Sequence, residues 1–191
     1  AGLPWFFQFW SRDTLVSLKA LSKINKLFAE KIFYLYLNAI RNEGRLPNLV
    51  KKNFFSNLGS ADAHGWLFFR CNEIIKEIDK SKEVIASIKN SMKLIKQNKN
   101  YNSPRIKEYF KKCNSIINKK ENEYHKIIYE IESSLEKSLT GILKFHTKDN
   151  FEVNDKLETW MDTEFENDNR AGIRIEIQAL TLNMLKTAKD V

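Results

Sequence analysis

Apolar residues recur at helical spacing over most of this 191-residue chain, and strand-like alternation of apolar and polar residues is almost absent. The longest such pattern comprises Tyr124, Ile127, Ile128, Ile131, Leu135, Leu139 and Leu143. A stripe of this spacing gives a helix one buried face, whereas it cannot give a strand one. The chain is therefore predicted to be all-α, with roughly six to eight helices in antiparallel succession.

Capping residues and helix breakers place the individual helices. Asp62 is a preferred N-cap residue, Pro104 suits the first position of a helix, and Gly44 suits the position just after one. The expected helices begin near residue 14 and cover approximately residues 25–41, 62–96, 104–117, 121–145 and 172–189.

Three irregular segments separate the helices: residues 1–13, 42–61 and 146–171. Loops of this length in a compact protein usually have a function. Antiparallel helix pairs return the chain to the same end of a molecule, so we expect the three loops to gather on one face of a single helical domain covering residues 1–191.

The chain has a net charge of +8, from 32 Lys and Arg against 24 Asp and Glu. A basic chain raises the question of nucleic-acid binding. Between residues 76 and 137, however, the lysines alternate with glutamates and aliphatic residues at helical spacing, which is typical of solvated helix faces. We therefore expect no nucleic-acid partner, and a basic protein whose middle binds nucleic acid is the weakest of the alternatives.

The content of 42% hydrophobic and 12% aromatic residues excludes a disordered chain. No run approaches about 18 consecutive apolar residues, and the first residues lack the basic start of a signal peptide. We therefore expect a soluble, cytoplasmic protein with no membrane partner.

Cysteines and histidines do not indicate a metal or cofactor site. Cys71 and Cys113 lack the spacing of a zinc site or a disulfide framework, so we expect buried thiols. The three histidines, His64, His125 and His146, are scattered, and we expect neither a metal nor a cofactor. His64, two residues after Asp62, is a minor candidate for substrate contact.

Several tryptophans stand near charged residues, as in Trp10-Ser11-Arg12-Asp13 and Thr159-Trp160-Met161-Asp162. Sugar rings stack their C–H faces on aromatic rings, while their hydroxyls need charged or planar hydrogen-bonding partners. These segments therefore favour a carbohydrate site. The alternatives are that the tryptophans fill the core, that Arg12 and Asp13 form a surface pair or helix cap, and that Asp162 is a turn residue.

The chain resembles the glucosidase domain of glycogen debranching enzymes, the amylo-alpha-1,6-glucosidase type, and more distantly glucoamylases. The matching blocks, in the family's order, are residues 1–6 with 10–13, Gly44 to Asn48, Ser60 to Ala63 with Trp66, Thr159 to Asp162, and Arg170 to Leu180. Members fold as an (α/α)6 toroid of twelve helices that holds the sugar in a pocket at one end. The resemblance implies that this chain is the N-terminal half, a partial toroid.

The resemblance also implies roles for individual residues. Arg12 and Asp13 would grip hydroxyls of the terminal glucose, and Asp162 would be the general acid that protonates the glycosidic oxygen. The implied substrate-binding residues are Trp5, Trp10, Arg12, Asp13, Asp62, Trp66, Trp160, Arg170 and Glu176. Their substrate would be an α-glucan or malto-oligosaccharide.

The family inverts configuration, which requires a second carboxylate as base. That base comes from the C-terminal part of the family's domain, and no residue of this sequence matches it. We therefore expect an α-glucosidase of the debranching type that needs either its complementary C-terminal half or self-association. The alternative is a non-catalytic glucan-binding or assembly subunit derived from the family.

Two positions near the C-terminus depart from the family's pattern. Gln178 stands where members usually have Asn, and Thr181-Leu182 stands where they usually have an aromatic pair. We expect these exchanges to change packing more than chemistry.

Overall fold

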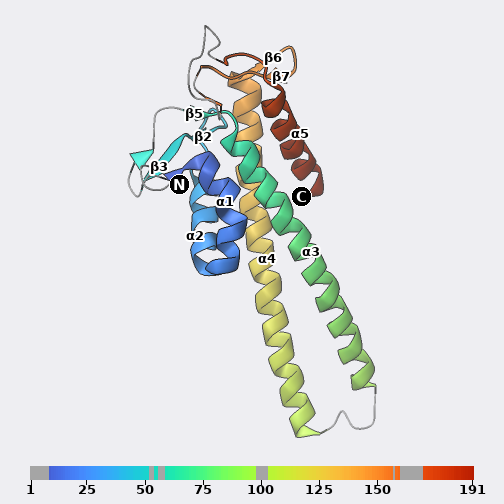
Figure 1. The fold of residues 1–191 in the computed structure, drawn as a ribbon. Coiled ribbons are helices and arrows are strands. Elements are labelled where there is room, and N and C mark those ends of the chain that lie inside the picture. Colours follow the sequence, from blue (N-terminus) through green and yellow to red (C-terminus); the bar gives the residue numbers. More distant parts are fainter. Residues whose placement is uncertain (1–8, 52–53, 56–58, 98–102, 157, 160–169) are drawn as a thin grey trace. The chain divides into compact units, whose positions relative to one another are not determined.

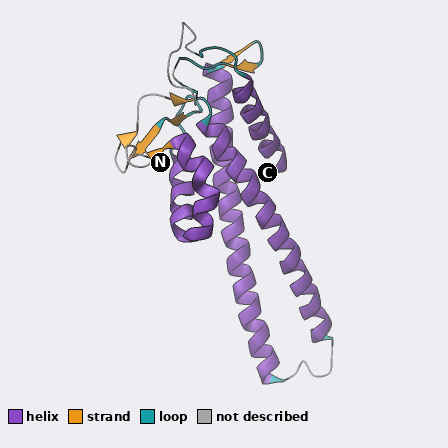
Figure 2. Cartoon of the chain, in the orientation of Figure 1, coloured by secondary structure: helices purple, strands orange, loops and turns teal. Residues whose placement is uncertain are grey.

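The computed structural model describes residues 9–51, 54–55, 59–97, 103–156, 158–159 and 170–191. Among these residues, helices dominate and all strands are two or three residues long (Figure 2). The helices are α1 (Ser11–Ile24), α2 (Lys26–Asn38), α3 (Ala63–Lys96), α4 (Pro104–Phe145) and α5 (Ile175–Asp190). The all-α prediction is confirmed, whereas the toroidal arrangement stays a prediction.

The described residues divide into two compact units. The first, which we call the loop unit, lies within residues 1–72 and 131–191, and the second, the hairpin unit, lies within residues 73–130. The organisation of residues 1–191 as a single domain stays a prediction. No helix among the described residues combines the length and the hydropathy that crossing a membrane requires.

Helices α1 and α2 of the loop unit lie side by side as a pair (Figure 1). The chain reverses at Asn25, whose side chain accepts a hydrogen bond from the Phe28 backbone N–H at 3.1 Å and so caps α2. Buried residues from both helices line the pair, among them Leu15, Leu18, Ile32, Phe33 and Tyr36.

Two glycines allow close packing in the loop unit, one between α4 and the turn after α2 and the other between α3 and α5. A Cβ atom at Gly141 of α4 would lie 2.2 Å from the backbone nitrogen of Gly44, in the turn after α2. A Cβ at Gly65 of α3 would lie 2.4 Å from Cβ of Leu180 in α5. These distances are far shorter than van der Waals contact, so both positions require glycine. Helix α4 thus supports the turn after α2, and α5 packs against the first turn of α3.

Short antiparallel strands organise the loops. Strand β3 (Leu49–Lys51) pairs with both β1 (Phe9–Trp10) and β4 (Phe54–Phe55). The other pairs are β2 (Leu46–Pro47) with β5 (Gly59–Ser60) and β6 (Thr147–Lys148) with β7 (Phe151–Glu152). Strands this short contain too few residues for alternation to show in the sequence.

In the hairpin unit, the second part of α3 and the first part of α4 form an antiparallel pair (Figure 1). Met92, Phe110 and Ile117 make its buried cluster, and Ile85, Ile106 and Cys113 pack against it. Lys89 of α3 lies 2.7 Å from the Glu121 carboxylate of α4.

Three sequence predictions need comment. The division into helices 104–117 and 121–145 was wrong, because α4 is continuous through residues 118–120, where no glycine or proline interrupts it. The buried-thiol prediction is confirmed for Cys71, whereas Cys113 is only half-buried. The last helix begins at Ile175 rather than near Gly172, whose φ of 102° is not helical.

Candidate functional site

The three long loops meet in the loop unit, as the sequence predicted. Phe9 pairs with Val50 in the β1–β3 ladder, which joins the first loop to the second. The Ala61 backbone N–H donates to the Glu158 carbonyl at 2.8 Å, which joins the second loop to the third. Segments far apart in the sequence are thereby brought to one place.

The centre of the candidate site is a pair formed by Arg12 and Asp62. Asp62 lies directly before α3, is only 2% exposed, and accepts a hydrogen bond from the Ser60 hydroxyl at 2.6 Å. Nη1 of Arg12 lies 3.6 Å from Oδ2 of Asp62, and Nε of Arg12 lies 3.6 Å from Oδ1 of Asp13. The structure therefore brings together three of the predicted sugar-binding residues.

Electrostatics at Asp62 reflect two opposing effects. Burial raises the pKa of the Asp62 carboxyl above its ordinary value, while the Ser60 hydroxyl, the positive charge of Arg12 and the electrostatic interaction with His64 counteract that rise. The Asp62 carboxyl is therefore almost completely removed from water.

Two of the predicted tryptophans lie close to this pair in sequence. Trp10 directly precedes α1 and is partly buried. Trp66, in the first turn of α3, is also partly buried and contacts Phe69 edge-on, with ring centroids 5.8 Å apart. Neither ring is fully buried, so both retain surface that a ligand can contact.

Arg170 and Glu176, the two predicted residues at the C-terminal end, form an ion pair. Nε of Arg170 also donates to the Thr159 hydroxyl at 3.4 Å. The Arg170 backbone has a φ of 54°, and its carbonyl accepts a hydrogen bond from the Asn154 side chain at 2.6 Å. The side chain of Arg170 thus connects α5 with buried Thr159, the first residue of the block that continues to Asp162.

The remaining predicted residues, Trp5, Trp160 and Asp162, lie outside the described residues, as does Met161. The roles proposed for them stay predictions.

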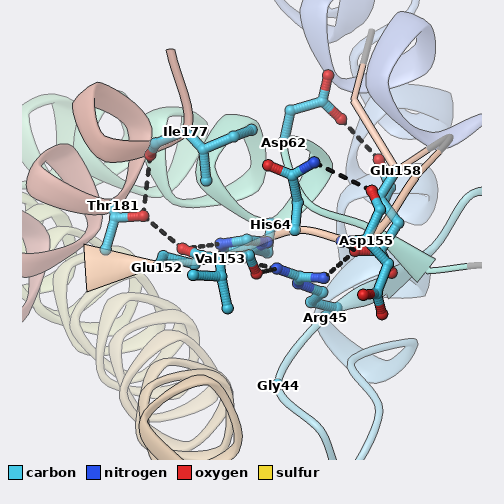
Figure 3. A network of polar contacts seen from close by, with 12 residues as sticks. Gly44, Arg45, Asp62, His64, Glu152, Val153, Asp155, Glu158, Ile177 and Thr181 are labelled. Carbon is cyan, nitrogen blue, oxygen red and sulfur yellow. Dashed lines mark hydrogen bonds and ion pairs between the residues drawn. The ribbon is translucent and has the colours of Figure 1, made fainter. Parts of the chain in front are cut away.

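A buried network that no sequence pattern predicted lies next to Asp62 (Figure 3). Its centre is the fully buried side chain of Arg45, which forms ion pairs with Glu152 and with Glu158. Glu152 in turn lies 3.4 Å from Nε2 of His64 and accepts a hydrogen bond from the Thr181 hydroxyl. Arg45 and Glu152 are 107 residues apart in the chain, so spacing alone could not have paired them.

The network holds Glu152 strongly ionised. Burial alone would raise its pKa, but the electrostatic interactions with His64 and Arg45 and the hydrogen bond from Thr181 lower it from 4.5 to about 2. His64 is completely buried beside this carboxylate. Its contact with Glu152 explains why a histidine stands here without requiring a contact to substrate.

The two departures from the family's pattern also contact Glu152. The amide of Gln178 bonds both backbone groups of Glu152, accepting from its N–H at 3.1 Å and donating to its carbonyl at 2.7 Å. Thr181 binds its side chain. One weak clue was available in the sequence: Arg45 stands directly before the apolar pair Leu46-Pro47, and a charged side chain that is buried beside apolar residues needs a buried partner.

Together, the described residues offer a donor fork, the buried carboxyl group of Asp62 and the exposed carboxylate of Asp13 at a place where three loops meet. Arg and Asp side chains in this arrangement suit a ligand with several neighbouring hydroxyl groups.

The chain was compared with family models, curated proteins and solved structures. The family model described as amylo-alpha-1,6-glucosidase matches residues 1–191, the whole chain. Searches of curated proteins and of solved structures returned no match.

Proposed function

We propose that this chain, which belongs to the amylo-alpha-1,6-glucosidase family, forms the sugar-gripping part of a glycoside hydrolase site that acts on α-glucan. Membership of the family supports a function related to glycogen debranching. The observation that carries the proposal for this chain is the Arg12–Asp62 pair, with Asp13 beside it, at the junction of the three loops.

In this proposal Arg12 donates to hydroxyls of the terminal glucose, and Asp13 and Asp62 accept from them. The guanidinium is a rigid donor group, and each carboxylate can accept from two neighbouring hydroxyls. The two tryptophans next to the pair, Trp10 and Trp66, supply aromatic surface for the C–H face of the sugar.

Asp162 is the proposed general acid. It must stay protonated near neutral pH, which requires a pKa raised by burial or by neighbouring carboxylates. Trp160 and Met161 are proposed to supply the apolar surroundings, and Glu164, Glu166 and Glu176 the negative charge. Hydrolysis with inversion further needs a base about 6.5–9.5 Å from the acid, with a water between them. We propose that the C-terminal half of the domain supplies this base.

Binding can be tested on the chain by titrating its tryptophan fluorescence with maltose and with isomaltose. Asp62→Asn preserves shape but removes the charged acceptor, and is expected to weaken binding about tenfold or more, as for loss of a charged hydrogen bond. The matched control is Asp79→Asn, on the helix that follows Asp62, since Asp79 is 60% exposed and pairs only with Lys82 among the interactions described for it. Wild-type fluorescence unchanged by either sugar would contradict the proposed site.

Catalysis is tested separately, by mixing the chain with a polypeptide that supplies the C-terminal half of the domain and measuring glucose released from a branched α-glucan. Release that is abolished by Asp162→Asn supports the proposed acid. Sugar binding without any release would instead support the alternative, a non-catalytic glucan-binding subunit.

A further inference from the structure

We infer that Arg45 is a positioning residue for the proposed glucan site, an inference that rests on the proposed function. Arg45 does not belong to the sugar-gripping set. It acts through Glu152 and Glu158, which both reach the short segment that holds Asp62 in place (Figure 3).

Backbone contacts hold Arg45 in place independently of its side chain. Gly44 has a φ of 89°, which favours glycine, and a Cβ there would lie 2.2 Å from the Ser138 carbonyl oxygen. The turn therefore packs directly on α4. The Arg45 carbonyl accepts a hydrogen bond from the Arg41 backbone N–H at 3.0 Å, which closes the turn.

From this fixed point, one guanidinium holds three acceptors of the third loop. Nη2 lies 3.2 Å from Oε1 of Glu152 and also donates to the Val153 carbonyl, while Nη1 binds the Glu158 carboxylate. The planar fork of arginine can hold several acceptors in fixed directions, whereas a lysine ammonium acts as a single point charge.

Each of the two glutamates then contacts a residue on one side of Asp62, Glu158 through its backbone and Glu152 through its side chain. The backbone carbonyl of Glu158 accepts from the N–H of Ala61, the residue just before Asp62, at 2.8 Å. The side chain of Glu152 lies 3.4 Å from His64, two residues after Asp62. If Arg45 lost its fork, both supports of this segment would shift, and Asp62 would move relative to Arg12.

Glu158 also supports a second part of the site. Its carboxylate accepts from the Asp155 backbone N–H at 2.7 Å, which fixes the turn before Thr159. Thr159 accepts from Arg170, the partner of Glu176. Arg45 is therefore linked to both groups of described site residues.

Stability alone does not account for this arrangement. Burying an arginine with two carboxylates carries a large desolvation cost, and apolar residues of similar volume often give equal or greater stability. What an ionic network adds is direction, because each hydrogen bond has a defined geometry. In the proposed site, Asp62 needs a fixed orientation to accept hydrogen bonds from sugar hydroxyls.

The decisive variant is Arg45→Lys, which keeps the charge and removes the fork. We expect its dissociation constant for maltotriose, measured by tryptophan fluorescence below the unfolding temperature, to rise about tenfold, because small displacements of site groups have effects of this order. The matched control is Arg41→Lys, the same exchange at the start of the same turn, where the arginine forms a partly exposed pair with Glu43 at 3.2 Å. The affinity of Arg41→Lys for maltotriose is expected to stay within about twofold of wild type.

A purely structural role would lower the thermal midpoint of Arg45→Lys and leave the affinity of the folded protein unchanged, and that result would overturn the inference. If Arg45→Lys does not fold, Glu158→Gln replaces it, with Glu43→Gln as control. Glu158→Gln keeps the shape and is expected to weaken maltotriose binding about threefold, since it loses one charge-assisted bond. Wild-type affinity in that variant would equally overturn the inference. If the wild-type chain does not bind maltotriose, the proposed function fails, and the inference falls with it.

Discussion

Both units of this chain contain ion pairs between a basic residue and a glutamate, but the pairs differ in their exposure to water. In the hairpin unit, Lys89 and Glu121 form an ion pair whose side chains are 47% and 34% exposed. In the loop unit, Arg45 and Glu152 form one whose side chains are 1% and 0% exposed. Water screens the first pair, whereas the second depends entirely on its protein partners. Charge in the hairpin unit thus lies at a hydrated surface, while charge in the loop unit is buried and is proposed to orient a site.

The largest expected effect comes from removing the buried cation. Arg45→Met leaves Glu152 and Glu158 without their shared partner, and breaking a buried pair in this way typically costs about 3–5 kcal/mol. Urea unfolding followed by circular dichroism measures the loss. A loss below about 1 kcal/mol would show that the buried and exposed pairs do not differ as described.

Acid should act on the loop unit through Glu152. Its pKa falls from 4.5 to about 2 on folding, so its contribution is present above the unfolded value and is lost as the pH falls toward 2. The shift corresponds to about 3 kcal/mol. Urea unfolding at several pH values should show stability declining between about pH 5 and pH 2, less steeply in Glu152→Gln.

Asp62 contributes to the same pH profile with the opposite sign. Its pKa is raised on folding, so protonation on acidification favours the folded state. Asp62→Asn should therefore steepen the net decline in acid. An identical acid profile in wild type and Glu152→Gln would contradict the account of the network.

In the hairpin unit, apolar packing should matter more than charge. Ile117→Val removes one buried methyl group next to Met92 and Phe110 and is expected to cost about 0.5–1.5 kcal/mol. The same urea titration measures this loss. If this variant is as stable as wild type while Lys89→Met is not, the hairpin is held by its ion pairs instead.

The smallest effect is expected for Lys89→Met, the hairpin counterpart of Arg45→Met. Because Lys89 and its partner are partly solvated, the loss should be below about 0.5 kcal/mol. Measuring both variants under the same conditions tests the comparison directly. Equal losses would refute it.

Much of the fold could be predicted from local patterns. Helical periodicity indicated the all-α class, and Asp62 and Pro104 marked the starts of α3 and α4. The continuity of α4 was missed, because a polar stretch at residues 118–120 resembles a loop although nothing in it breaks a helix. The strand pairs were missed because two-residue strands leave no periodic signal.

Only part of the candidate site could likewise be predicted from the sequence. Resemblance to a family pointed to Arg12, Asp13 and Asp62. The structure places the Arg12 guanidinium within ion-pair distance of both carboxylates. The network around Arg45 was not predictable, since Arg45 and Glu158 are 113 residues apart and belong to no common motif. A buried charge and its partners are matched only when the chain folds.

By itself, the sequence determined the helical class and the positions of the long loops, because each depends on neighbouring residues. Its short motifs indicated the residues that are proposed to bind a sugar. Only the tertiary structure decided which residues of the loops touch, that His64 lies buried against Glu152, and that a single guanidinium pairs with both Glu152 and Glu158. The physical reason is that burial removes water as a partner, so the identity of each buried charge's neighbour is set by the folded contacts.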